Sequence, residues 1–222
     1  AIGAHRNDGN GELSGHVRVY QNLLGVWTKI GNDIDGEAAG DQSGYSVSLS
    51  ADGSILAIGA RYNDGNGSNS GHVRIYQNIS GVWTQIGTDI DGEAAGDYSG
   101  VSVSLSSGGN IVAIGAEGND ANGSASGHVR LYQNISGVWT QIGDDIDGEA
   151  EYNNSGASIS LSTDGNIVAI GAEYNNGNGS ISGHVRIYQN ISGVWTQIGA
   201  DIDGESANDY SGISVSLSSE GS

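Results

Sequence analysis

The sequence predicts an all-β fold, a β-propeller of four-stranded antiparallel blades, from three observations. The quartet Ala-Ile-Gly-Ala recurs every 56 residues. Each copy contains short apolar runs rich in β-branched residues and bounded by Gly, Asn, Asp and Ser, which is typical of strands. A unit of this size cannot bury its own sheet, and radial stacking is the usual solution at this period, with a linear solenoid as the alternative. We expect one domain, 1–222, with repeats 1–56, 57–112, 113–168 and 169–222.

Each repeat is predicted to hold four strands, which the second copy illustrates. Residues 46–50 alternate serine with apolar side chains, so the serines share one face and leave room for a neighbouring sheet. Residues 55–60 are apolar on both faces, which requires cover on both sides. Residues 72–77 and 82–86 follow, joined by a short turn, and the last strand carries the only tryptophan of the repeat.

The two ends of the chain are predicted to complete one blade. Residues 1–4 correspond to a second strand and residues 213–218 to a first strand, so pairing the two would close a ring and remove both open sheet edges. The chain contains no Met, which predicts a processed product or a piece of a longer array.

Composition favours an acidic, extracellular protein. The formal net charge is -19, which repels nucleic acid and anionic lipid, while it favours solubility, accumulation of cations or a basic partner. There is no cysteine for a disulfide and no apolar run long enough for membrane insertion. We therefore expect a secreted or cell-surface location.

The repeat resembles the FG-GAP repeat of integrin-α-type propellers. The resemblance rests on residues 70–76 (Ser-Gly-His-Val-Arg-Ile-Tyr), Gly92-Glu93, 97–100, 102–106 and 113–116. It implies a secreted or surface propeller used for adhesion or assembly. Two features depart from the family pattern. Ser-Gly replaces the Phe-Gly that gives the family its name, and the loop that would hold calcium, between first and second strands, has one carboxylate or none, so those calcium sites are not carried over.

Two other segments are candidates for Ca²⁺. The loop after the second strand has oxygen donors at its first, third and fifth positions, a spacing found in calcium loops, although the same residues form ordinary turns. Its donors are Asp8, Asn10, Glu12, Asp64, Asn66, Asp120 and Asn122. The second candidate is the turn Asp33-Ile-Asp35-Gly-Glu37 and its copies, whose carboxylates could equally pair with an arginine of the adjacent unit.

Each repeat also has one strand arginine and one strand histidine on the same face. We expect each arginine (Arg18, Arg74, Arg130 and Arg186) to pair with a carboxylate of the Asp-Ile-Asp-Gly-Glu turn and to tie blades together. The histidines are not expected to be catalytic bases, because no nucleophile accompanies them. Because every candidate residue occurs four times whereas an enzyme usually builds one asymmetric site, an enzyme is not predicted.

The tryptophans and the glycosylation sequons support a binding alternative. Trp27, Trp83, Trp139 and Trp195 either pack under a neighbouring blade or form ligand-binding platforms for sugar rings. Seven Asn-x-Ser sequons fall in predicted loops, at Asn66, Asn78, Asn122, Asn134, Asn153, Asn178 and Asn190.

Taken together, these features predict a non-enzymatic structural or adhesive scaffold. Its partner would be a protein or a glycan at the cell surface, and a homo-oligomer or a larger repeat assembly stays open. A carbohydrate-binding propeller with one equivalent site per blade is the alternative.

Overall fold

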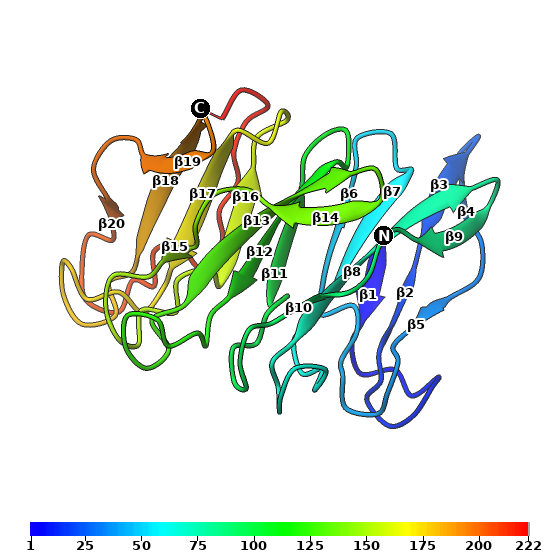
Figure 1. Ribbon diagram of the computed structural model, residues 1–222, viewed down its shortest axis with the longest axis horizontal. Coiled ribbons are helices and arrows are strands. Elements are labelled where there is room, and N and C mark those ends of the chain that lie inside the picture. The colour runs from blue at the N-terminus through cyan, green and yellow to red at the C-terminus, as the bar shows by residue number, and fades with distance from the viewer. Residues whose placement is uncertain (222) are drawn as a thin grey trace.

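The computed structural model describes residues 1–221, so Ser222, the last residue of the predicted fourth repeat, lies outside the described part. Residues 1–221 form β-strands joined by loops, and the sheets follow one another in chain order, from the first at the right of Figure 1 to the last at the left. Within these residues, no helix has the length and apolar character needed to cross a bilayer. The predicted all-β architecture of repeated antiparallel sheets is confirmed.

The second sheet shows the common plan. It contains β6 (Ser46–Leu49), β7 (Ile55–Ala60), β8 (His72–Ile79), β9 (Val82–Gln85) and β10 (Ile90–Asp91). β6, β7 and β8 pair as an antiparallel meander, while β9 and β10 both pair with β8. The outermost position is therefore shared by two short strands, one at each end of β8.

The remaining sheets repeat this plan. The third holds β11 (Ser102–Leu105), β12 (Ile111–Ala116), β13 (His128–Ile135), β14 (Val138–Gln141) and β15 (Ile146–Asp147). The fourth holds β16 (Ser158–Leu161), β17 (Ile167–Ala172), β18 (His184–Ile191), β19 (Val194–Gln197) and β20 (Ile202–Asp203). At the N-terminus, β1 (Ile2–Ala4), β2 (His16–Arg18) and β5 (Ile34–Asp35) form one sheet, and β3 (Tyr20–Leu23) and β4 (Val26–Lys29) form a separate hairpin.

The fourth strand predicted at 82–86 is found as β9, and the structure adds a second short strand, β10, on the same edge of the sheet. β9 ends at Gln85, opposite Tyr76, and the chain leaves the sheet before β10 returns to pair Asp91 with His72. Gly87 lies in this break with a φ of 74°, a conformation that glycine adopts without strain. The break places Asp89 beside the start of β8, which matters for the site described below.

The hydrophobic core lies between sheets rather than within one. All six residues of β7 are buried. Ile55 and Ala57 pack in a cluster with Val112 of the third sheet, whereas Leu56 packs on the other side in a cluster with Val17. A strand that is apolar on both faces is stable only between two covering layers, so each sheet depends on its neighbours.

The serines of the inner strands link successive sheets, as their small size predicts. The Ser46 hydroxyl donates a hydrogen bond to the carbonyl of Gly100 at 2.7 Å, and the Leu105 N–H donates to Ser48 Oγ at 3.0 Å. Gly59 faces the same Gly100 carbonyl so closely that a β-carbon would overlap it. The backbones of adjacent sheets therefore meet where the inner strands begin.

The predicted closure of the ring is wrong. Within residues 1–221, β1 pairs only with β2, and residues 213–218 form no strand. Instead, the Leu217 N–H donates to Ser160 Oγ at 2.9 Å, so this segment runs beside β16, at the far end of the row from β1 (Figure 1). Each innermost segment after β6 is hydrogen-bonded to the inner strand of the preceding sheet, and the sheets form an open row.

Candidate active site

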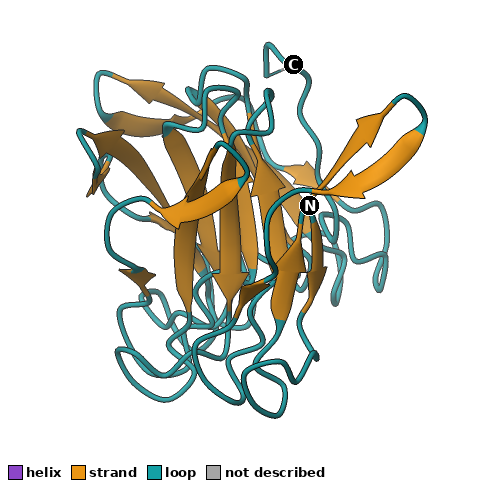
Figure 2. Ribbon diagram, turned by 90° about the vertical axis from the view of Figure 1, so that its right-hand side faces the viewer, coloured by secondary structure: helices purple, strands orange, loops and turns teal. Residues whose placement is uncertain are grey.

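The two positions that directly follow the constant Ala-Ile-Gly-Ala quartet differ between the repeats. The residue directly after the Ala-Ile-Gly-Ala quartet is His5, Arg61, Glu117 or Glu173 in successive repeats. It follows β1, β7, β12 or β17 at the end of each sheet where the inner strand begins, because Ser46 pairs with Gly59 and Ser102 with Gly115. The long loops between second and third strands gather at the same end of the sheets (Figure 2). We call His5, Tyr45, Arg61, Glu117 and Glu173 the inner-edge cluster.

Arg61 is the central residue of this cluster. Its Nη1 lies 3.6 Å from Glu117 Oε1, and its guanidinium carbon lies 3.9 Å from the centre of the Tyr45 ring. Nη2 donates a hydrogen bond of 2.9 Å to the Tyr62 hydroxyl. His5 packs edge-on against the ring of Tyr45, with ring centres 5.4 Å apart. The side chains of Arg61 and Glu117 are each 21 % exposed, so both can be reached from solvent.

Partial burial shifts the pKa values of three members. Burial raises the pKa of Glu117, with Arg61 opposing the shift and Glu173 adding to it. Burial also raises the pKa of Glu173. The pKa of His5 is lowered, first by burial and then by Arg6 and Arg61. A carboxyl that retains its proton more readily than usual beside a guanidinium provides a general acid or base next to a hydrogen-bond donor for a developing negative charge.

A second polar feature recurs between neighbouring sheets. Each instance joins a glutamate of one sheet's final turn to a histidine and an aspartate of the next sheet. We call these groups the seam clusters; they are Glu37–His72–Asp89, Glu93–His128–Asp145 and Glu149–His184–Asp201. In all three the histidine Nδ1 lies 3.6 Å from the aspartate Oδ2. The distance to the glutamate Oε2 is 3.9 to 4.0 Å.

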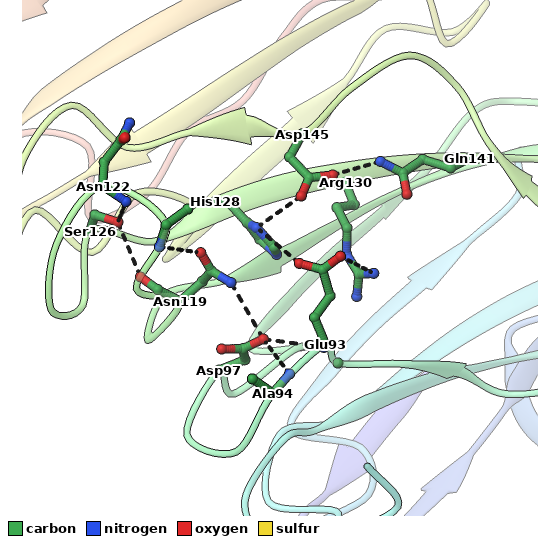
Figure 3. Close-up of polar contacts among 12 residues, drawn as sticks. Glu93, Ala94, Asp97, Asn119, Asn122, Ser126, His128, Arg130, Gln141 and Asp145 are labelled. Carbon is green, nitrogen blue, oxygen red and sulfur yellow. Dashed lines mark hydrogen bonds and ion pairs between the residues drawn. The ribbon is translucent and has the colours of Figure 1, made fainter. Parts of the chain in front are cut away.

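The middle seam cluster shows how the fold assembles this group (Figure 3). His128 is the first residue of β13, Asp145 immediately precedes β15, and Glu93 follows β10 of the preceding sheet. The Gln141 amide donates to Asp145 Oδ1 at 2.6 Å, and Arg130 Nη1 lies 3.5 Å from Glu93 Oε1. Burial, together with the Arg130 guanidinium, lowers the pKa of His128 to about 4, so the imidazole is neutral at neutral pH.

The expected pairing of each arginine with a carboxylate of the Asp-Ile-Asp-Gly-Glu turn is confirmed, but only three of the four pairs cross between sheets. Arg74 and Arg186 reach Glu37 and Glu149 of the preceding sheet at 3.2 and 3.6 Å, as Arg130 reaches Glu93. Arg18 pairs instead with Asp33 of its own sheet at 2.8 Å. The histidines and carboxylates of the seam clusters could also hold a metal ion.

The predicted calcium loops hold their own backbone together. Asp8, Asp64 and Asp120 accept hydrogen bonds of 2.7 to 2.8 Å from backbone N–H groups five residues later. The side-chain amides of Asn10, Asn66 and Asn122 donate to carbonyls of the final turn of the sheet. Glu12 is exposed in the first loop. These loops therefore position the turns that carry the seam glutamates, and Ca²⁺ binding there stays a prediction.

Three of the tryptophans lie against the preceding sheet. The indole N–H groups of Trp83, Trp139 and Trp195 donate to the carbonyls of Ile30, Ile86 and Ile142 at 3.1, 2.9 and 2.8 Å. Trp27, in the first sheet, is 68 % exposed. Trp195 also lines a cavity of about 340 Å³ with Asp145. A ligand-binding role for these rings stays a prediction.

The sequons are not all in loops. Asn78, Asn134 and Asn190 lie near the ends of β8, β13 and β18, contrary to expectation, and each accepts a hydrogen bond from the glycine of the following turn. Asn153 is buried and its side chain accepts a hydrogen bond from Asn175. The loop residues Asn66, Asn122 and Asn178 use their side-chain amides to hold backbone carbonyls. Glycosylation of the seven sites stays a prediction.

Comparison with known proteins supports the repeat family and the fold. A model of the FG-GAP repeat matches residues 34–76. No curated protein matches the chain in sequence. Among solved structures, the chain is similar to the periplasmic gluconolactonase of Pseudomonas aeruginosa, with a TM-score of 0.57 and 16 % identity over 90 % of this chain and 53 % of that one.

Two further solved structures are provisionally assigned 6-phosphogluconolactonases. The one from Bacteroides uniformis has a TM-score of 0.57 and 12 % identity, and covers 85 % of this chain and 48 % of its own. The one from Bacteroides fragilis has a TM-score of 0.53 and 14 % identity, and covers 76 % of this chain and 41 % of its own. The chain spans about half the length of these structures. At such low identity, the similarity establishes the fold alone.

This comparison overturns the functional prediction. The exclusion of an enzyme, and with it the non-enzymatic adhesive scaffold, is wrong, because it rested on the repetition of the fold, and structures with a similar repeated fold are described as lactonases. The physical reason is that a repeated fold does not require a repeated site. Sequence reasoning considered only residues present in every copy and missed the inner-edge cluster, although the signal was available: the residues directly after a constant quartet differ between the repeats.

Proposed function

We propose that this chain, which carries an FG-GAP repeat, acts as a hydrolase that opens sugar lactones, the cyclic esters of sugar acids, at the inner-edge cluster. The observation that carries the proposal is the Arg61–Glu117 pair. A partly exposed carboxyl with a raised pKa lies 3.6 Å from a guanidinium, at a position where the repeats diverge. The similarity in fold to gluconolactonases supports the choice of substrate class.

Opening a lactone needs the groups that this pair provides. A water oxygen attacks the carbonyl carbon, the carbonyl oxygen gains negative charge, and the bond from that carbon to the ring oxygen breaks. Glu117 takes the proton from the attacking water and returns it to the ring oxygen as that oxygen leaves, which yields the open hydroxy acid. Arg61 donates hydrogen bonds to the negatively charged oxygen in the transition state.

The charge of the protein narrows the substrate class. With a formal net charge of -19, the protein repels phosphorylated substrates at long range. A neutral sugar lactone avoids this repulsion, and its product carries a carboxylate that the same field helps to expel. We therefore infer that the substrate is a lactone without a phosphate group.

The test is the hydrolysis of gluconolactone by the full chain, followed as acid release at constant pH. We expect the wild-type protein to exceed the buffer rate, and Glu117→Gln to lose roughly 10²- to 10⁴-fold in kcat, as removal of a general base does. Glu205→Gln, an exposed carboxylate away from the cluster, serves as the matched control and should retain the wild-type rate. A wild-type rate equal to that of buffer, or full activity in Glu117→Gln, would refute the proposal.

Other expectations remain proposals. A secreted or cell-surface location and assembly into oligomers or longer arrays are supported only by the acidic, cysteine-free composition and the repeats. Fractionation of the native source and solution mass of the purified chain are the corresponding measurements.

A further inference from the structure

His128 is a buried polar side chain without a hydrogen-bond partner. Its side chain is 1 % exposed, and neither ring nitrogen has a partner among residues 1–221. Leaving such a group unsatisfied is costly, and most buried polar atoms in proteins have a partner. Its Nδ1 faces Asp145 Oδ2 and Glu93 Oε2 at 3.6 and 4.0 Å, which is too long for hydrogen bonds (Figure 3).

The spacing of these three atoms fits a shared cation. A Zn²⁺ ion binds nitrogen and carboxylate oxygen at about 2.0–2.2 Å, so its ligand atoms lie roughly 3–4 Å from one another. The nitrogen and the two oxygens of each seam cluster all lie within 4.8 Å of one another. A small inward rotation of the half-exposed glutamate would complete the geometry.

We propose that each seam cluster binds one divalent transition-metal ion, through the histidine Nδ1 and one oxygen from each of the two carboxylates. The mixed donor set decides the class of metal. Ca²⁺ prefers a shell of six to eight oxygens, whereas an imidazole with two carboxylates suits Zn²⁺ and similar ions. The site is distinct from the inner-edge cluster, and it does not rest on the proposed lactonase activity.

Neighbouring residues hold the carboxylates in place for such an ion. The Gln141 amide donates a hydrogen bond of 2.6 Å to Asp145 Oδ1, which leaves Oδ2 facing the histidine. Equivalent bonds of 2.6 Å join Gln85 to Asp89 and Gln197 to Asp201. Arg130 contacts Oε1 of Glu93 and leaves Oε2 free. Contacts of this kind orient ligands in metal sites.

The position of the site gives the ion a structural role. Glu93 belongs to the turn after β10, whereas His128 and Asp145 belong to the third sheet. An ion bound by all three therefore fastens one sheet to the next. Because it binds only the folded chain, it raises the stability of the fold in proportion to the logarithm of its concentration.

His16 provides a matched control within the same chain. It lies 3.8 Å from Asp33, but Asp33 is already bound by Arg18 at 2.8 Å and by Lys29 at 2.7 Å. Among residues 1–221, no glutamate is paired with His16. The first sheet therefore has the histidine and the aspartate without the rest of the site, and it should not bind the ion.

The experiment measures bound metal directly. The full chain is stripped with a chelator, equilibrated with Zn²⁺, and analysed for zinc by mass spectrometry, with Co²⁺ absorption spectra as a second readout. We expect three ions per chain in the wild-type protein, in line with the three seam clusters. His128→Gln and Glu93→Gln should each bind two, and His16→Gln should still bind three.

The outcomes separate this proposal from the proposed activity. Absence of zinc in the wild-type protein, or three ions in both His128→Gln and Glu93→Gln, would overturn it. If His128→Gln does not fold, Glu93→Gln decides, because Glu93 is 46 % exposed and the change preserves its size. No substrate enters the measurement, so failure here leaves the lactonase assay informative, and failure of that assay leaves the zinc count informative.

Discussion

The seam clusters and the inner-edge cluster use the repeats in opposite ways. Each seam cluster has the same residue types, with the same 3.6 Å separation between histidine and aspartate. At the inner edge, the equivalent position is occupied by His5, Arg61, Glu117 and Glu173. Each pair of neighbouring sheets needs contacts that hold it together, so the seam cluster recurs with the same residues. A reaction site needs an acid or base beside a hydrogen-bond donor of another residue type, so equivalent positions in neighbouring repeats must carry different residues.

The largest change in stability is expected from loss of a seam arginine. Arg130→Ala removes a side chain that is buried between sheets and donates at 2.7 Å to the carbonyl of Asp91 while contacting Glu93. Losing these interactions should lower the free energy of unfolding by about 1–3 kcal/mol. Urea denaturation measures this loss.

Arg18 provides the comparison for that variant. It occupies the equivalent position in the first sheet, where its side chain is 44 % exposed and pairs with Asp33 of the same sheet. Arg18→Ala should therefore lower stability less than Arg130→Ala. Equal losses in the two variants would mean that contact across the seam does not distinguish them.

A smaller change is expected from the loops that position the seam glutamates. The Asn66 amide donates to the carbonyls of Gly92 and Glu93, both at 2.9 Å, so Asn66→Ala should cost about 1–2 kcal/mol. Asn122 donates to the carbonyl of Gly148, and Asn122→Ala should cost about 1 kcal/mol. Thermal unfolding of the two variants in chelator tests this order, and a reversed order would count against the positioning role.

The fold was largely predictable because it is encoded by local patterns. Strands 46–50 and 55–60 were found almost to the residue, since alternation and full burial leave distinct signatures in the sequence. The short strand β10 was not predicted, because residues 89–93 were assigned to a copy of the Asp-Ile-Asp-Gly-Glu turn. Ring closure was also wrong, because complementary sequence ends do not establish that those ends meet.

The candidate site was less predictable, for a reason that follows from the same repeats. The histidines and the Asp-Ile-Asp-Gly-Glu turns were each identified, but only the fold shows that His128 meets Glu93 from the preceding sheet. The Arg61–Glu117 contact joins residues 56 positions apart in different sheets. Such contacts depend on how sheets stack, which single-strand patterns do not specify.

The smallest expected effect tests whether Glu117 differs electrostatically from ordinary surface carboxylates. Burial raises its native pKa above its usual value of 4.5, so the native chain retains a proton that the unfolded chain has already lost. This contribution to stability is complete below pH 4.5 and is lost as pH rises through the native pKa of Glu117.

Glu117→Gln should therefore remove part of the decline in unfolding free energy that follows as the pH rises above 4.5, measured by urea denaturation. Glu173, whose pKa is also raised, contributes a decline of the same sign that persists in the variant. Glu205→Gln should leave the wild-type slope unchanged. Parallel curves for the wild type and Glu117→Gln would show that Glu117 titrates like an exposed carboxyl, and the inner-edge cluster would then lose the property that sets it apart from the seams.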